Sequence, residues 1–242
     1  MAEALEQLGA QGGDWGIDLD ASQVRLFDRY ASLLAGYELA NVIGTRDWAQ
    51  IVLEHFVDSL SCLAAANTHW DGCLIDVGTG GGLPGIPLSI ACPDLHVVLL
   101  EATEKKVRFL EYVKAELKLE NLNVLHARAE VAGRESRYRE AFELATARAV
   151  AAVPVVLEYC APFVSLGGKI LAMKGRLQEE ELSQGVAAAR ELGTALGETL
   201  VLNYRSQLPQ KERRLIVFDK TGITPASFPR RIGLAKKRPL GS

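Results

Sequence analysis

Between residues 22 and 66, the apolar positions of the chain recur every three or four residues. This is the period of one face of an α-helix. The pattern therefore predicts an N-terminal helical subdomain, which we place over residues 1–70. Its two apolar stripes are Leu26, Tyr30, Leu33, Leu34 and Tyr37, and Val52, Leu53, Phe56, Val57, Leu60 and Leu63.

From residue 71 onward, the pattern changes to seven short apolar runs, and amphipathic stretches separate the first five. Nearly continuous apolar runs suit strands that are covered on both faces. We therefore expect an α/β fold: a Rossmann-like, doubly wound, seven-stranded and mainly parallel sheet. Only Arg205 to Arg213 separate the last two runs, too few for a crossover helix, so the last strand should be antiparallel. The runs cover residues 73–77, 96–100, 123–127, 142–147, 168–173, 199–204 and 214–218.

Capping and turn residues predict several boundaries. Thr103 can cap a helix whose core face includes Val107 and Leu110. Pro84 suits an early helical position, because its missing N–H would lack a partner there anyway. Pro225, Pro229, Gly233 and Pro239 within the last twenty residues predict extended chain. We therefore expect a main domain over residues 71–222 and a C-terminal tail over residues 223–242.

The composition is that of an ordinary globular protein, with 48% hydrophobic and 24% charged side chains in 242 residues. The four cysteines never form a C-x-x-C pair, so neither a zinc site nor a redox motif is indicated, and we expect no metal. No apolar run approaches the ~18 residues of a membrane span, and the first residues lack the pattern of a signal peptide. We expect a cytoplasmic protein that does not bind membranes.

The net charge of -3 conceals an asymmetry along the chain. Residues 1–100 carry a net charge of -10, residues 101–210 are balanced, and residues 211–242 carry +7. A basic end can approach a polyanion, because each neutralised phosphate releases condensed counterions. A solvated tail that only aids solubility is the alternative interpretation.

The most informative segment is the glycine-rich sequence from Asp76 to Gly82, which follows the first predicted strand. This is the place where an open parallel sheet binds nucleotides. A dinucleotide-binding loop would read G-x-G-x-x-G, but Leu83 stands where its third glycine belongs, and the chain has no G-x-x-x-x-G-K-[ST] phosphate loop. The pattern is instead D-x-G-x-G-x-G.

That pattern, with Glu101 at the end of the second strand, resembles the class I S-adenosylmethionine-dependent methyltransferases. Their cofactor carries no phosphate. Glu101 lies 23 residues after Gly78, where a carboxylate at a strand tip can accept both ribose hydroxyls. Glu130, after the third strand, lies where the adenine edge would be recognised. We expect S-adenosylmethionine as the cofactor.

A longer set of motifs resembles the bacterial ribosomal RNA small subunit methyltransferase G family, also called glucose-inhibited division protein B. The match runs from about residue 25 to the end, with one departure at Asn41-Val-Ile, where the family usually has Asn-Leu-Thr. Its motifs here are Asp76 to Ile90, His55-Phe-Val-Asp58-Ser59-Leu60, Lys105-Lys106-Val-Arg-Phe-Leu110, Arg128-Ala-Glu130, Arg148-Ala149-Val150, Met173-Lys174-Gly175 and Phe228-Pro-Arg-Arg-Ile-Gly233.

This resemblance implies methyl transfer to N7 of a guanine in 16S ribosomal RNA, within the small ribosomal subunit. It also implies which residues contact the cofactor, and we add Asp76 and Gly80 from the loop itself. The complete set is Asp76, Gly78, Gly80, Leu83, Glu101, Ala102, Thr103, Ala129, Glu130 and Arg148.

Guanine N7 carries a lone pair and no proton, so its methylation requires no general base. Proximity and electrostatic control would supply the catalysis. We therefore assign no catalytic residue; of the four dispersed histidines, His55 is the best placed by its motif. The basic residues expected to hold RNA phosphates are Lys174, Arg176, Arg230, Arg231, Lys236, Lys237 and Arg238, with Lys211, Arg213, Arg214 and Lys220 as further candidates.

Three other interpretations stay open at this point. The methyl acceptor can be a small molecule or a protein. The same loop can serve a nicotinamide-dependent oxidoreductase, although Leu83 argues against this. The chain can also be a non-catalytic RNA-binding assembly factor that has kept the fold.

Overall fold

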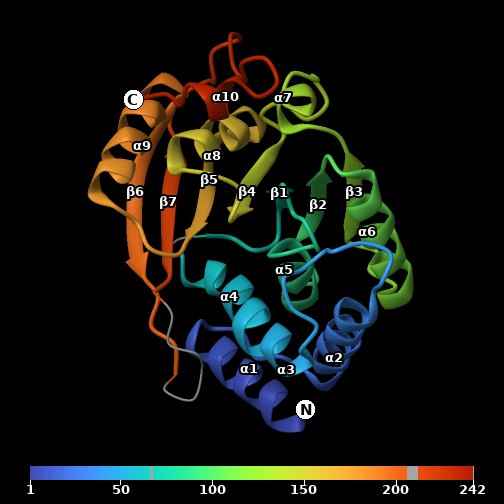
Figure 1. Ribbon diagram of the computed structural model, residues 1–242. Helices are drawn as coiled ribbons and strands as arrows, with labels where there is room; N and C mark the ends of the chain where they lie inside the picture. Colours follow the sequence, from blue (N-terminus) through green and yellow to red (C-terminus); the bar gives the residue numbers. More distant parts are fainter. Residues whose placement is uncertain (66–67, 206–211, 242) are drawn as a thin grey trace.

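The computed structural model describes residues 1–65, 68–205 and 212–241. Its centre is a seven-stranded sheet with the strand order β3-β2-β1-β4-β5-β7-β6 (Figure 1). The order reverses direction at β1, which is the topological switch point of a doubly wound sheet. The strands are β1 (Cys73–Val77), β2 (His96–Glu101), β3 (Leu122–His126), β4 (Phe142–Arg148), β5 (Val164–Lys174), β6 (Thr194–Val201) and β7 (Arg214–Lys220).

Strands β1 to β5 pair in parallel, whereas β7 is antiparallel to both β5 and β6. This confirms the predicted α/β sheet with an antiparallel last strand. In the register, Asp76 of β1 lies between Leu99 of β2 and Thr146 of β4. The loops that follow β1, β2 and β4 therefore leave the sheet side by side.

Helices cover both faces of the sheet, and alternate strand residues enter two separate cores. Leu74 and Leu171 pack with the N-terminal helices, whereas Ile75 and Ala172 pack with the helices of the second half. The first face carries α1 (Ala2–Asp14), α2 (Ala21–Gly36), α3 (Trp48–Gln50), η1 (Ile51–Phe56), α4 (Val57–Leu60), η2 (Ser61–Ala64), α5 (Gly85–Ala91) and α6 (Glu104–Leu117). The second face carries α7 (Ala129–Ala132), α8 (Val153–Cys160), η3 (Ala161–Phe163), α9 (Glu179–Glu191) and α10 (Leu234–Lys237).

The predicted helical stripes both lie on helices at the N-terminal end of the molecule (Figure 1). The stripe around Phe56 belongs to a continuous helical segment, residues 48–64, whose middle part η1 is a π-helix. Such segments are rare and often mark functional sites. Helix α1 was not predicted. Among the described residues, no helix combines the length and apolar character needed to cross a bilayer.

Several predicted boundaries were wrong. Strand β6 covers 194–201 rather than 199–204, because this edge strand is largely exposed and needs no apolar run. Pro84 precedes α5 instead of lying inside it. Thr103 is the N-cap residue of α6, as predicted, although its side chain makes no cap hydrogen bond. The tail contains the short helix α10, which Figure 1 shows beside α7 and α8, far from α1.

Candidate functional site

The glycine loop after β1 is held in a shape that only glycine allows at one position. Gly78, Gly80 and Gly82 all have positive φ angles. A Cβ atom at Gly82 would lie 2.3 Å from Ile86 Cδ1 and 2.8 Å from Tyr30 Oη. Tyr30 Oη also donates a hydrogen bond of 2.5 Å to the carbonyl of Gly81. Helix α2 is thereby tied directly to the loop.

Asp76 is fully buried beneath this loop and stabilises it from inside. Its Oδ2 accepts hydrogen bonds from Thr79 Oγ1 at 2.5 Å and from the Gly85 N–H at 2.9 Å, and its Oδ1 accepts one from Thr146 Oγ1 at 3.2 Å. Burial raises the pKa of Asp76 to about 6, although these hydrogen bonds and Arg148 oppose the shift. The Asp76 carboxylate thus already accepts a hydrogen bond from the first N–H of α5, at the place where a dinucleotide-binding fold would bind pyrophosphate.

Glu101 ends β2 and lies next to the glycine loop. Its Oε2 accepts a hydrogen bond of 3.1 Å from the Gly80 N–H, and its Oε1 accepts one of 2.7 Å from the Thr103 N–H. The carboxylate is therefore fixed at the rim of a pocket of about 170 Å³. Val77, Gly78, Leu100, Glu101, Ala102, Ala127, Arg128, Ala129, Glu130, Val150, Tyr159, Gly233 and Lys236 line this pocket, which we call the nucleoside pocket.

Glu130 also lines the nucleoside pocket and is almost fully buried. Its Oε1 accepts a hydrogen bond of 2.9 Å from the Gly233 N–H of the C-terminal segment. Burial raises the pKa of Tyr159 to about 12, and the charge of Glu130 and a hydrogen bond with it add to this shift. Two glutamates, Glu101 and Glu130, thus line one pocket, which suits a ligand that offers hydroxyl and amine donors.

A second pocket, of about 290 Å³, lies at the ends of β4 and β5; we call it the acceptor pocket. Asp58 connects its basic residues: Arg148 Nη1 lies 3.2 Å from Asp58 Oδ2, and Arg213 Nε lies 3.0 Å from Oδ1. Tyr204 Oη donates a hydrogen bond of 3.0 Å to the same carboxylate. Burial, and next the Asp58 charge, raise the pKa of Tyr204 well above its ordinary value. The pocket is lined by His55, Asp58, Arg148, Ala149, Met173, Lys174, Gly175 and Arg213.

The two pockets meet at the segment that follows β4. Ala149 lines the acceptor pocket, and the next residue, Val150, lines the nucleoside pocket. Ala149 has a φ angle of 54°, which is unfavourable for a residue with a Cβ. Strained residues of this kind cluster at functional sites. Two consecutive residues of one segment therefore contribute to both pockets.

The structure divides the predicted cofactor residues into three groups. Gly78, Glu101, Ala102, Ala129 and Glu130 line the nucleoside pocket. The backbone N–H groups of Gly80 and Thr103 donate hydrogen bonds to the Glu101 carboxylate. The remaining three lie elsewhere: Asp76 beneath the loop, Leu83 in the core against the N-terminal helices, and Arg148 in the acceptor pocket.

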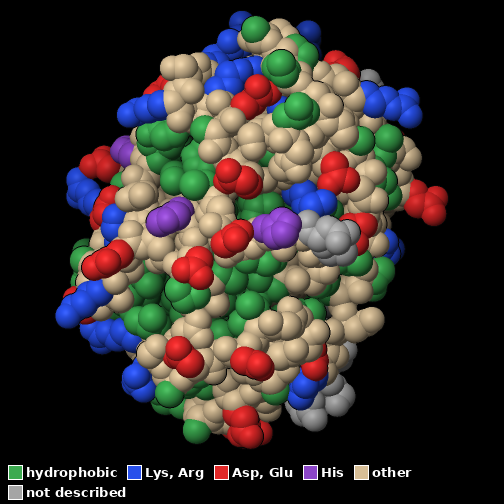
Figure 2. Space-filling view, turned by 180° about the vertical axis from the view of Figure 1, so that it is seen from behind, with side chains coloured by type: hydrophobic (Ala, Val, Ile, Leu, Met, Phe, Trp, Pro, Cys, Tyr) green, Lys and Arg blue, Asp and Glu red, His purple; other side chains and the backbone are tan. Residues whose placement is uncertain are grey.

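The predicted RNA-binding cations differ in their exposure to solvent and in whether they form ion pairs within the protein. Lys174 Nζ already lies 2.8 Å from Glu181 Oε1, and Arg230 is paired with the buried Glu158. Lys220 is also buried, and Lys211 lies outside the described residues. Basic side chains gather at the end of the molecule that carries α10 (Figure 2). Among the predicted cations that the structure describes, those classed as exposed are Arg176, Arg231, Lys236, Lys237 and Arg238.

Sequence reasoning missed several residues of both pockets. Tyr159 and Gly233 enter the nucleoside pocket from α8 and from the C-terminal segment. Met173 enters the acceptor pocket from β5, together with Arg213, which was a predicted phosphate-binding candidate. The sequence contains no local signal for these contacts, because they bring together residues far apart in the chain. The motifs at Phe228 to Gly233 and at Met173 to Gly175 were the only hints.

Comparisons with known proteins agree on one family. The model of the family described as rRNA small subunit methyltransferase G matches residues 23–205. A protein of Rubrobacter xylanophilus called ribosomal RNA small subunit methyltransferase G is 44% identical over 238 residues, which are 98% of this chain and 91% of that protein. A protein of the same name from Roseiflexus castenholzii is 40% identical, over 98% of this chain and all of that protein.

Solved structures support the fold alone. The antibiotic-resistance methyltransferase Kmr matches with a TM-score of 0.52 and 18% identity over 62% of this chain and 87% of its own. A variant of the branched-chain polyamine synthase of Thermus thermophilus, solved with 5'-methylthioadenosine, matches with a TM-score of 0.58 and 16% identity over 83% of this chain and 64% of its own. The sheet is therefore that of a Rossmann-like class I methyltransferase.

Proposed function

The chain belongs to the rRNA small subunit methyltransferase G family, an enzyme family, and on this premise we propose that it transfers a methyl group from S-adenosylmethionine to guanine N7 in 16S ribosomal RNA. The observation that carries the proposal is the pair of adjoining pockets, one with two carboxylates and one with several cations. Its substrate would be the small ribosomal subunit, which fits the expected cytoplasmic location.

The nucleoside pocket fits S-adenosylmethionine better than a nicotinamide dinucleotide. Glu101 and Glu130 can accept hydrogen bonds from ribose hydroxyls and from the adenine amine. A pyrophosphate would require the free amides at the start of α5, but Asp76 already accepts the Gly85 N–H there. An oxidoreductase is therefore not supported. When bound, S-adenosylmethionine supplies an electrophilic methyl group.

The acceptor pocket supplies donors for an RNA base and its phosphates. Arg148 and Arg213 share the single carboxylate of Asp58, so their side chains are held in place before any ligand binds. Their N–H groups can donate to oxygen atoms of a guanine or of a neighbouring phosphate. The partly compensating charge of Asp58 lowers the cost of forming a cationic base beside two arginines.

No proton leaves guanine N7 during methylation, so these residues need only bind and align the base. Holding two reacting groups in register can remove several kcal/mol from a barrier. The side chains at the acceptor pocket fit such a role. Tyr204 donates a hydrogen bond to Asp58, and His55 lies near the end of the π-helix η1. We assign all of them to positioning.

The direct test is incubation with methyl-labelled S-adenosylmethionine and small ribosomal subunits that lack the modification, followed by nucleoside mapping. We expect label in 7-methylguanosine of 16S RNA. Label in another molecule, such as a protein or a small metabolite, would contradict the assigned substrate. Binding of RNA without any transfer would instead support the assembly-factor interpretation.

Asp58→Asn provides a variant for the same assay. The asparagine keeps the size of the side chain but removes the charge that holds Arg148 and Arg213, so kcat should fall about tenfold to hundredfold. Affinity for S-adenosylhomocysteine should stay unchanged, because Asp58 lies outside the nucleoside pocket. Equal loss of both quantities would show that Asp58 acts on the overall fold.

A further inference from the structure

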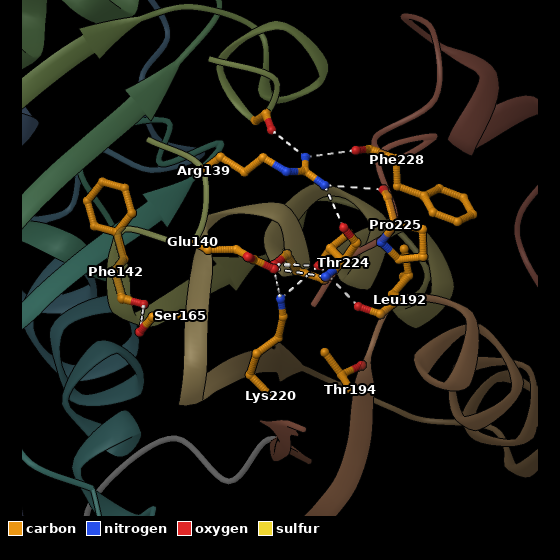
Figure 3. A network of polar contacts seen from close by, with 12 residues as sticks. Arg139, Glu140, Phe142, Ser165, Leu192, Thr194, Lys220, Thr224, Pro225 and Phe228 are labelled. Atoms are coloured by element: carbon orange, nitrogen blue, oxygen red, sulfur yellow. Dashed lines mark hydrogen bonds and ion pairs between the residues drawn. The ribbon is translucent and has the colours of Figure 1, made fainter. Parts of the chain in front are cut away.

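The C-terminal segment is bound to the body of the protein by polar contacts at several places. We call residues 221–241 the C-terminal strap. Its first anchor is Lys220, whose buried Nζ donates to Glu140 Oε1 at 2.7 Å and to Thr224 Oγ1 at 2.8 Å (Figure 3). The Thr224 N–H donates to the same Glu140 oxygen at 2.8 Å. The start of the strap is therefore fixed inside the protein.

Two arginines of the loop before β4 hold the next part of the strap. Arg139 donates to the carbonyl oxygens of Thr224 at 2.7 Å and of Phe228 at 2.9 Å, as Figure 3 shows. Arg134 donates to the carbonyl of Ser227 at 3.0 Å. These hydrogen bonds attach the backbone of the strap to the loop before β4.

The third anchor lies beside the nucleoside pocket. Glu158 of α8 is buried and accepts hydrogen bonds from the Arg230 backbone N–H at 2.9 Å and from its Nε at 2.9 Å. Arg230 Nη2 also donates to the Arg238 carbonyl at 2.8 Å, which closes the strap on itself. Ala235 and Leu240 of the strap are buried in the second core. Arg230 therefore links the strap to α8 through Glu158.

Between these anchors, the strap reaches the nucleoside pocket. Gly233 and Lys236 line it, and the Gly233 N–H donates to Glu130. Gly233 has a φ angle of 76°, in the left-handed region that favours glycine. We propose that the strap is the outer wall of the nucleoside pocket and that the Gly233 amide orients Glu130 to accept the amine of an adenine nucleoside. This inference rests on the proposed function.

The first test measures amide hydrogen exchange in the full chain with and without S-adenosylhomocysteine. Ligand binding is established separately by calorimetry. We expect binding to slow exchange in residues 229–240, because the ligand lies against this wall. Binding without any change in these residues would overturn the proposal. Absence of binding would instead contradict the proposed function.

The second test uses Gly233→Ala with Gly16→Ala as its matched control. Both glycines have positive φ, and a Cβ atom at either would meet no atom within 4 Å. The two variants therefore bear the same local backbone cost, but only Gly233 touches the pocket. We expect Gly233→Ala to weaken the binding of both adenosine and S-adenosylhomocysteine by about fivefold to tenfold, and Gly16→Ala to leave both affinities unchanged.

Thermal unfolding of both variants separates binding from folding. Because the local costs match, their melting temperatures should fall by similar amounts. Equal affinities in the two variants would overturn the role of Gly233. Loss of adenosine binding in Gly233→Ala at a melting temperature equal to that of Gly16→Ala would support it.

Discussion

Replacement of Asp76 by asparagine should stabilise the protein at pH 8. The carboxylate is fully buried, and its pKa of about 6 means that folding disfavours its charged form. A displacement from 3.8 to about 6 corresponds to about 3 kcal/mol, since each tenfold change in an acid constant is worth about 1.4 kcal/mol. Asparagine removes this cost, because it carries no charge at any pH.

Asparagine can also keep the three hydrogen bonds of Asp76. Its oxygen can accept from Thr79 Oγ1 and the Gly85 N–H, while its amide donates to Thr146 Oγ1, a hydroxyl that can accept as well as donate. We therefore expect Asp76→Asn to raise the free energy of unfolding by about 1–3 kcal/mol at pH 8. Asp76→Ala leaves the same three donors without a partner and should lower it by about 2–4 kcal/mol.

The pH dependence gives this prediction its sign. A raised carboxyl pKa means that the folded state binds the proton more tightly, so the wild type gains stability relative to Asp76→Asn as the pH falls from about 7 to about 4. Urea unfolding of both proteins at pH 8, 6 and 4.5 measures the difference between them. The reasoning is refuted if Asp76→Asn is the less stable protein at pH 8, or if the gap does not narrow on acidification.

Two further predictions concern the loop and the strap. Gly82→Ala should lower the free energy of unfolding by about 3 kcal/mol or more, because its Cβ would clash with Ile86 and Tyr30. Gly80→Ala should lower it by only about 1 kcal/mol, because its Cβ would meet only Lys106 Nζ, at 3.9 Å. Equal losses of the two variants in urea unfolding would contradict this. Lys220→Met should lower the free energy of unfolding by about 3 kcal/mol, because it leaves Glu140 without its buried cation. The double variant Lys220→Met with Glu140→Gln should recover part of this loss. A double variant no more stable than Lys220→Met alone would count against a stabilising ion pair.

The sheet could be predicted from the sequence because its strands are buried on both faces and therefore read as apolar runs. The exceptions follow from the same physics: β6 is an edge strand with little apolar surface, and the apolar spacing of residues 48–64 does not distinguish a π-helix from an α-helix. Helix α1 was missed where the first residues looked only acidic.

The residues of the nucleoside pocket could be predicted from the sequence only where they lie at the ends of successive strands. Gly78, Glu101 and Glu130 follow three successive strands, and the fold brings such positions together. Arg230 looked like a surface cation, because its partner Glu158 lies 72 residues earlier in the chain. The Arg148 contact with Asp58 spans 90 residues and left no local trace either. Long-range pairing of charges decides these roles.

The carboxylate of Asp76 at the start of α5 has one more consequence, for the competition among metabolites. A cell contains adenine in many forms, and most of them carry a chain of phosphates. Asp76 lies beneath the loop and Glu101 lies at the rim of the pocket. A phosphate chain would therefore meet negative charge instead of the free backbone N–H groups that usually bind it. Electrostatic repulsion would thus weaken the binding of ATP and other adenine nucleotides, so that the adenine site stays available to a ligand without phosphate.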